Sequence, residues 1–370
     1  MHAILPMPET RAMQPPPDKR PGGLGQLLVS AAHWAGHSWK WLKWPVAIGI
    51  LFWLFHKNQA NLVKIAGAPK IWGYAVLAFL LIASSTLLTF TRWYLLVWAQ
   101  EFPFRFRDAV RYGFIGLVAN YIAPGAVGGD LFKGVLLARE QSSRRVVAFA
   151  TVLLDRILGL LALFFVGACT TFFPQGIPQN PELQKATILL WCGAGGGLIG
   201  LAAMLIPATT RWGWVNRLSR LPLVGKPIGE LIAGVKLYQT KPKIILSSLG
   251  LSVLGHAGLI TGFYFCALWM WQPWVPNLVG HFYFLPTAEL FAVLIPTPGG
   301  VGALEEAVSW FYGQLRPANV PEAQALAAGA MAGIAYRVVA LSIAALGAVY
   351  YFTSRREISA AMEEAAQIDE

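Results

Sequence analysis

The sequence has little charge and almost no cysteine. Only 13% of its 370 residues are charged, whereas soluble domains average about 25%, so the chain lacks the polar surface that a compact body needs in water. Hydrophobic residues make up 56% of it. The only cysteines, Cys169, Cys192 and Cys266, fall inside apolar segments without metal-type spacing, which excludes a disulfide scaffold. These features predict an integral membrane protein.

Acidic residues are also scarce, with 18 Asp and Glu against 29 Lys and Arg, for a net charge of +11. Nucleic-acid-binding proteins gather their basic residues on a soluble face, whereas here Lys and Arg punctuate long apolar runs, so no nucleic-acid partner is expected. No Ser-His-Asp arrangement, phosphate-binding loop or dinucleotide fingerprint is present, and His256 and His281 stand alone. The sequence therefore predicts a protein that is not an enzyme and that has no metal and no cofactor.

The apolar stretches predict an all-α polytopic membrane domain over residues 24–352. Residues 1–23 and 353–370 are expected to be solvated cytoplasmic tails, the first of them disordered because it contains scattered charges and three consecutive prolines. Tryptophan mixed with lysine over 24–43 predicts an interfacial helix, and apolar residues at helical spacing over 226–240 predict a helix on the cytoplasmic surface. Six stretches are candidates for full spans, the first of them short: 41–56, 71–98, 146–174, 186–206, 243–271 and 322–352.

Two further apolar stretches are too short to cross and are each broken by proline and glycine. We expect them to form re-entrant hairpins over 109–136 and 282–315. The positive-inside rule supports this topology, because 20 basic residues then fall on the cytoplasmic side and five on the other side. Both chain termini are then cytoplasmic, in a protein of the cytoplasmic membrane.

The two breaks share the pattern Pro-Gly-small-Val-Gly, and each is followed by an acid and later by an intramembrane arginine. Because the spans before the two breaks run in opposite directions, we expect the halves to be inverted repeats, an architecture typical of transporters. A chance recurrence of proline and glycine is the alternative. The hairpin motif consists of Pro124, Gly125, Gly128 and Gly129 in the first half and Pro298, Gly299, Gly300 and Gly302 in the second.

Ionisable side chains at membrane depth are costly, so each needs a partner or a function. We take nine as candidate substrate-binding residues: Arg92, Asp130, Lys133, Asp155, Arg156, Glu289, Glu305, Glu306 and Arg337.

Simpler roles exist for several of these residues. Arg92 stands near a span end, where snorkelling to the interface is the alternative. Asp130, Glu305 and Glu306 fall in the first turn after a break, where acids cap helices. Lys133 shares a helical face with Asp130 and can neutralise it.

Asp155 and Arg156 point about 100° apart on a helix, so they need different partners. Lys133 or Arg337 is a candidate partner for Asp155. Arg156 is expected to reach Glu305 or a substrate. In the functional hypothesis, Arg156 and Arg337 bind an anionic group, since guanidinium holds phosphate bidentately and helix N-termini add positive dipole ends. Purely structural ion pairs are the alternative.

Three motifs in order resemble the lysylphosphatidylglycerol synthase transmembrane family, also called flippase-like domain proteins. They are NYIAPGAVGGD at 120–130, LDR at 154–156 and PTPGGVGALE at 296–305, and the likeness extends over about residues 70–352. The resemblance implies lipid translocation without specifying the lipid. The synthases carry a soluble aminoacyl transferase domain after the membrane part, and this chain ends roughly 18 residues after its last predicted span, so lipid aminoacylation by this polypeptide is not expected.

These observations predict a translocase that moves a polar or anionic lipid between leaflets of the cytoplasmic membrane, its acids balancing charge or carrying protons. The alternative is a membrane-embedded transferase or an accessory subunit in lipid glycosylation or modification. The expected partners are membrane lipids with an anionic headgroup and a lipid-modifying enzyme.

Overall fold

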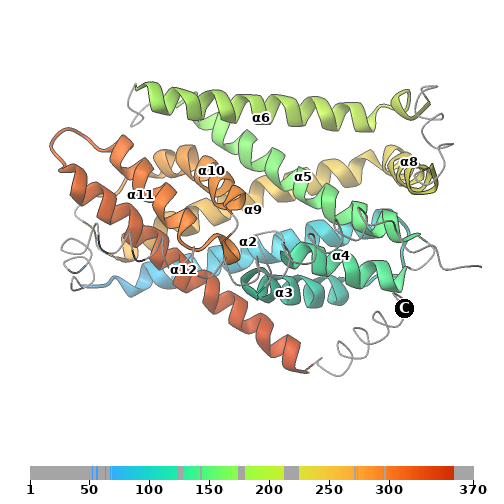
Figure 1. The fold of residues 1–370 in the computed structure, drawn as a ribbon, viewed down its shortest axis with the longest axis horizontal. Helices are drawn as coiled ribbons and strands as arrows, with labels where there is room; N and C mark the ends of the chain where they lie inside the picture. Colours follow the sequence, from blue (N-terminus) through green and yellow to red (C-terminus); the bar gives the residue numbers. More distant parts are fainter. Residues whose placement is uncertain are drawn as a thin grey trace, which may run out of the picture. The chain divides into compact units, whose positions relative to one another are not determined.

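The computed structural model is helical, with no strand in the part of the chain that it describes: residues 69–122, 128–141, 144–173, 180–211, 225–270, 272, 274–295 and 297–353, with Phe52, His56, Val63 and Gly67. Five helices are long and apolar enough to cross a membrane: α2 (Trp72–Ala99), α5 (Arg145–Thr170), α6 (Pro181–Leu205), α9 (Pro242–Trp269) and α12 (Glu322–Thr353) (Figure 1). They confirm the predicted all-α polytopic class. The tail at 1–23, the helix at 24–43 and the span at 41–56 lie outside the described residues, as does the tail beyond 353.

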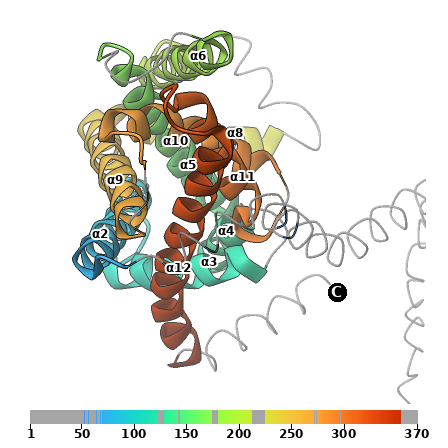
Figure 2. The ribbon, with the colours of Figure 1, turned by 90° about the vertical axis from the view of Figure 1, so that its left-hand side faces the viewer.

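α2 and α9 lie side by side (Figure 2) and are in extensive contact. The Ile71 backbone N–H at the start of α2 donates to the Trp269 carbonyl at the end of α9, at 3.2 Å. At the other end, Lys241 Nζ donates to the Ala99 carbonyl at 2.9 Å and pairs with Glu101 at 2.6 Å. The Lys241 ammonium lowers the pKa of the exposed Glu101 carboxyl. These contacts join opposite ends of the two helices, so the pair is antiparallel.

Two broken helical segments are attached to opposite ends of this pair. α3 (Phe106–Ile122) and α4 (Gly128–Glu140) follow the end of α2, whereas α10 (Leu278–Leu294), the 3-10 turn η3 (Pro298–Gly300) and α11 (Ala303–Leu315) follow the end of α9. Since α2 and α9 are antiparallel, the α3–α4 and α10–α11 hairpins approach each other from opposite ends of the bundle (Figure 1). Inverted repeats would produce this arrangement.

Both hairpins begin earlier in the chain than the sequence predicted. α3 begins three residues before the expected start at 109, because the Asp108 side chain accepts a hydrogen bond from the Arg105 backbone N–H at 3.0 Å and caps the first turn. α10 begins at Leu278, where Asn277 caps it by accepting from the Gly280 N–H at 2.8 Å. Neither cap belongs to the apolar pattern, so hydrophobicity alone places both starts too late.

α8 (Gly225–Thr240) packs beside the ends of α2 and α5. Its Tyr238 hydroxyl donates to the Leu96 carbonyl at 3.0 Å, and Gln100 at the end of α2 donates to the Gly234 carbonyl at 3.0 Å. The amphipathic segment predicted at 226–240 is therefore a helix held to the ends of the long helices, next to the α3–α4 hairpin.

Candidate functional site

The first charged cluster lies where α4 packs on α5. Asp130, in the first turn of α4, pairs with Lys133 on its own helix at 2.7 Å and with Arg156 on α5. Asp130 and Lys133 are buried, and Lys133 Nζ lies 5.2 Å from the centre of the Trp93 ring. The predicted neutralisation of Asp130 by Lys133 is thus seen. The suggested Arg156–Glu305 pair is wrong: Arg156 faces the acid of the hairpin that precedes its own helix.

A third ion pair of this region joins α2 to α5. Arg92 Nε donates to Asp155 at 2.6 Å, and Arg92 Nη1 donates to the Ser252 hydroxyl on α9 at 2.9 Å. Arg92 is only 5% exposed, so the snorkelling interpretation is wrong. The suggested Asp155–Arg337 pair is wrong as well, since Arg337 pairs with Glu305. Lys133, the other suggested partner, forms its ion pair with Asp130 and interacts with Asp155 only through charge. Gly159, one turn beyond Asp155, leaves the space that admits the guanidinium, since a Cβ there would lie 3.1 Å from Arg92 Nη1.

The residues of the three ion pairs carry more positive than negative charges. Three cations, Arg92, Lys133 and Arg156, face two carboxylates, Asp130 and Asp155. The cluster therefore has a formal excess of one positive charge between the short helix α4 and the candidate spans α2 and α5. Arg92 and Lys133 are buried against their partners, which leaves Arg156 as the accessible cation.

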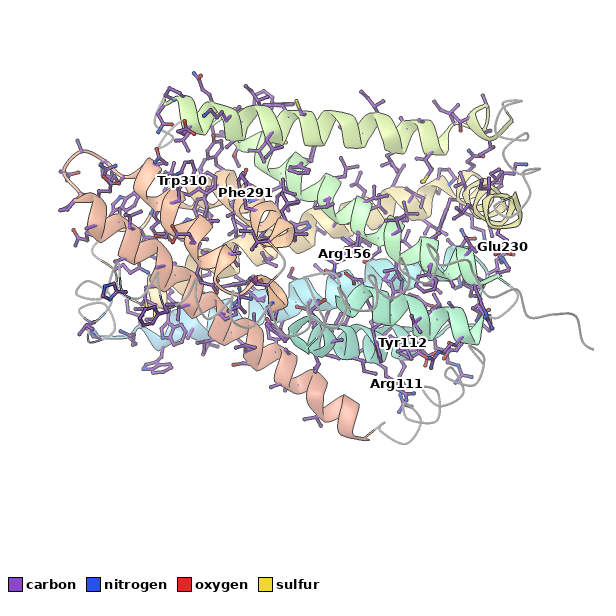
Figure 3. The ribbon with its side chains drawn as sticks, viewed as in Figure 1. Arg111, Tyr112, Arg156, Glu230, Phe291 and Trp310 are labelled. Atoms are coloured by element: carbon purple, nitrogen blue, oxygen red, sulfur yellow. The ribbon has the colours of Figure 1, made fainter. Side chains whose placement is uncertain are left out.

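Arg156 opens onto an apolar cavity. Its side chain is 43% exposed although Asp130 beside it is 4% exposed. The cavity measures about 340 Å³ and is formed mainly by Val146, Phe149 and Leu153 of α5, with Leu231 of α8 at its edge. Figure 3 shows Arg156 in the middle of α5, away from Phe291 and Trp310. An anionic group with an attached hydrocarbon chain fits such a surface, because the charge and the apolar wall are adjacent.

Arg337, the second arginine of the functional hypothesis, is held by hydrogen bonds to the α10–α11 hairpin. Arg337 on α12 donates from Nε to Glu305 Oε1 at 2.8 Å and from Nη2 to Glu305 Oε2 at 3.3 Å. It also donates to the carbonyls of Gly299 at 2.7 Å and Gly300 at 3.2 Å. Four of the five guanidinium N–H groups are therefore used. Glu305 also accepts from the Gly302 N–H at 2.7 Å, so the predicted capping is present.

The hairpins meet at their tips, with Tyr121 at the end of α3 against Gly299. A Cβ on Gly299 would lie 2.7 Å from Tyr121 Cε1, and its φ of 58° is one that residues with a side chain rarely adopt. In the first hairpin, a Cβ on Gly129 would overlap the carbonyl oxygen of Gly116, so glycine allows α3 and α4 to cross closely. The motif glycines thus have a packing role, whereas Pro124 and Gly125 lie outside the described residues.

A cavity of about 190 Å³ lies between these tips. α3 contributes Asn120 and Tyr121, α10 contributes Glu289, and α12 contributes Tyr336 and Arg337. Asn120 Oδ1 accepts from the Gly129 N–H at 2.8 Å and so closes the first hairpin. Of the nine predicted charged residues, Glu289 and Arg337 therefore border one cavity, whereas Arg156 and Asp130 border another.

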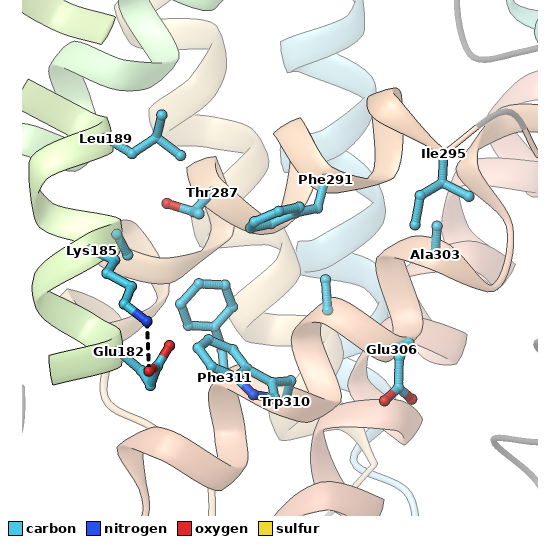
Figure 4. Close-up of a pocket in the computed structure, with 12 residues that line it drawn as sticks. Glu182, Lys185, Leu189, Thr287, Phe291, Ile295, Ala303, Glu306, Trp310 and Phe311 are labelled. Atoms are coloured by element: carbon cyan, nitrogen blue, oxygen red, sulfur yellow. Dashed lines mark hydrogen bonds and ion pairs between the residues drawn. The ribbon is translucent and has the colours of Figure 1, made fainter. Parts of the chain in front are cut away.

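A third and larger cavity, about 600 Å³, lies between α6, α10 and α11 (Figure 4). Phe291, Trp310 and Phe311 form much of its apolar lining, Glu306 lies at one end, and the Lys185–Glu182 pair, at 2.8 Å, lies at another. The Thr287 hydroxyl of α10 is buried, and no described group forms a hydrogen bond with it. The cavity therefore offers a hydrocarbon-sized space with a polar atom in its wall.

Several site residues were not singled out in the sequence, namely Asn120, Tyr121, Ser252, Thr287 and Tyr336. Asn120 and Tyr121 precede the first break directly, so the motif itself was the signal that could have found them. Ser252 and Thr287 look like ordinary hydroxyl residues of apolar helices. Within the described part of the chain, no group of three or more His, Cys, Asp and Glu side chains could hold a metal ion.

Comparison with known families gives one match, to the lysylphosphatidylglycerol synthase TM region, over residues 40–352. Neither the curated proteins nor the solved structures contain a match.

Proposed function

Because the chain belongs to the lysylphosphatidylglycerol synthase TM region family, a family of membrane proteins of lipid modification or translocation, we propose that it moves a lipid with an anionic headgroup between the leaflets of the cytoplasmic membrane. Both termini are cytoplasmic in this proposal. The α3–α4 hairpin then enters from the cytoplasmic side and the α10–α11 hairpin from the opposite side.

The observation that carries the proposal is the excess positive charge of the ion-pair cluster around Asp130 and Asp155, in which Arg156 is the accessible cation. A fixed charge among spanning helices is costly unless it has a counter-ion. Asp130 is already neutralised by Lys133, and Asp155 by Arg92. A phosphate that binds the half-exposed Arg156 would therefore balance the cluster, and guanidinium favours phosphate through two parallel hydrogen bonds.

The apolar cavities supply a place for the hydrocarbon part of the same lipid. The cavity at Arg156 and the one between α6, α10 and α11 have volumes of about 340 and 600 Å³, within the range of roughly 300–1,000 Å³ typical of ligand sites. In the proposed orientation the first lies on the cytoplasmic half and the second on the opposite half. A lipid bound successively at the two would have crossed between leaflets.

Arg337 has a different role from Arg156 in this proposal. Its hydrogen bonds to Glu305, Gly299 and Gly300 hold the tip of the second hairpin. It therefore positions the loop, and the headgroup is bound by Arg156 alone.

The test is headgroup movement in liposomes that contain the purified protein and a phosphatidylglycerol with a fluorescent headgroup. Arg156→Gln is expected to slow movement at least tenfold, because it removes the accessible cation while Asp130 keeps Lys133 as its partner. Arg145→Gln is the matched control, since Arg145 is an exposed arginine at the start of the same helix and its loss should leave the rate unchanged.

Two outcomes would contradict the proposal. One is wild-type movement no faster than that of Arg156→Gln. The other is formation of a modified lipid by the protein in detergent, where no leaflets exist, which would favour the membrane-embedded transferase.

A further inference from the structure

Glu289 lines the cavity between the hairpin tips, and no described residue forms an ion pair with its carboxylate. It lies on α10, an apolar helix of 17 residues, and its side chain borders the 190 Å³ cavity between the hairpin tips. Within the described ranges it makes no hydrogen bond and no ion pair, unlike Asp130, Asp155 and Glu305. Residues 123–127 and Pro296, which follow α3 and α10 in the sequence and are not described, contain no Lys, Arg or His.

The nearby arginine does not supply the missing charge. Arg337 borders the same cavity, but its guanidinium is hydrogen-bonded to both oxygens of Glu305 and to two carbonyls of the loop. The Arg337–Glu305 pair is already neutral. An ionised Glu289 would therefore add one negative charge to an apolar region, which is costly at membrane depth.

The other titratable or charged groups around the cavity are Tyr121 from α3 and Tyr336 from α12; Glu305 from α11 is committed to Arg337. α5, α6 and α9 also pack against α10, yet they contribute no residue to the lining of this cavity. Neither tyrosine is cationic in any protonation state. Since no described residue supplies a counter-charge, a cation taken from solution is the candidate to neutralise Glu289. A proton is the simplest such cation, because it requires no set of oxygen ligands.

We propose that Glu289 is a proton-binding site and that the transmembrane proton gradient drives lipid movement through it. The carboxylate takes a proton from hydronium on one side of the membrane, which forms one O–H bond, and returns the proton to water on the other side. Its place between the hairpins couples this exchange to their movement, since Tyr121 and Gly299 touch across the same cavity. This inference rests on the translocase proposed above.

The test uses the same liposomes with a pH difference of one unit across the membrane and the electrical potential clamped. The wild-type protein should move the labelled phosphatidylglycerol several-fold faster with the gradient than without it. Glu289→Gln should keep the gradient-free rate and lose the acceleration, whereas Glu289→Asp, which still titrates, should keep part of it. Glu182→Gln is the control, because that carboxylate is exposed and paired with Lys185.

A second measurement does not depend on transport. The infrared carbonyl band of a protonated carboxylic acid should be present in the purified wild-type protein at neutral pH and absent from Glu289→Gln. Equal gradient acceleration in Glu289→Gln, or wild-type acceleration by a sodium gradient at equal pH, would overturn the proton site. Absence of lipid movement under all conditions would overturn the translocase instead.

Discussion

Arg337 and Glu305 form a bidentate pair, with Nε–Oε1 and Nη2–Oε2 distances of 2.8 and 3.3 Å. The corresponding residues after the first break, Arg156 and Asp130, also pair, but there the arginine is 43% exposed. The same combination of acid and arginine thus closes a loop in one half of the chain and offers an accessible cation in the other. This difference separates the structural from the proposed binding role.

The Arg337–Glu305 pair should be essential for stability. Arg337→Ala leaves Glu305 buried without its partner, a change that typically costs about 3–5 kcal/mol, so thermal unfolding in detergent should begin at a clearly lower temperature. Arg316→Ala, which removes a partly exposed arginine that lies 3.4 Å from Glu322, is the control and should change little. An unchanged midpoint for Arg337→Ala would contradict the positioning role.

Arg92 and Asp155 should behave as a coupled pair. Arg92→Met and Asp155→Leu each leave one buried charge, so each should destabilise the protein strongly. The double variant leaves none, and it should be more stable than the sum of the two single effects by at least about 1 kcal/mol. Unfolding of all four proteins in detergent measures this coupling, and strict additivity would show that the two charges do not interact.

Gly299 should not tolerate a side chain. Gly299→Ala forces a Cβ to within 2.7 Å of Tyr121 and onto a φ of 58°, a conformation that costs about 1–2 kcal/mol. Gly195→Ala is the matched control, since nothing lies within 4 Å of a Cβ at that helical position, and it should be neutral or stabilising.

The cost of the contact with Tyr121 and the cost of the positive φ can be separated with a second substitution. Tyr121→Ala in the Gly299→Ala background should recover the part due to the clash but not the part due to φ. If Gly299→Ala had the stability of the wild type in detergent, the contact between the hairpin tips would be absent.

An apolar side chain at position 287 should make the protein more stable than Thr287 does. Its buried hydroxyl has no hydrogen-bond partner among the residues that the structure describes, so Thr287→Val should raise stability in detergent by roughly 1 kcal/mol. Thr151→Val should do the opposite, because that hydroxyl accepts from Trp93 at 3.3 Å and donates to the Ala148 carbonyl at 2.7 Å. A loss of stability in Thr287→Val would mean that the hydroxyl is already satisfied.

The long helices could be predicted from sequence alone because apolar runs of about 20 residues have one common physical cause, the thickness of the bilayer. α2, α9 and α12 accordingly begin and end within two residues of the predicted spans. α6 begins five residues early at Pro181, where Asn180 caps it by accepting from the Leu183 N–H at 2.8 Å. Capping depends on one side chain and one backbone group, which a hydrophobic pattern does not record.

For the charged residues, too, some features could be predicted from sequence and others depend on contacts in the folded protein. Their number, their membrane depth and the Asp130–Lys133 pair followed from the sequence, because an i, i+3 spacing places two side chains on one helical face. The partners of Asp155, Arg156 and Arg337 did not, since each lies on another helix whose rotation and crossing decide which side chains face each other. Sequence by itself therefore determined an all-α membrane protein with two broken segments and a few charged residues within its apolar stretches. Only the tertiary structure decided that Arg156 is accessible, that Arg337 is hydrogen-bonded to its hairpin and that Glu289 has no ion-pair partner among the described residues. Those properties depend on contacts between helices distant in the chain.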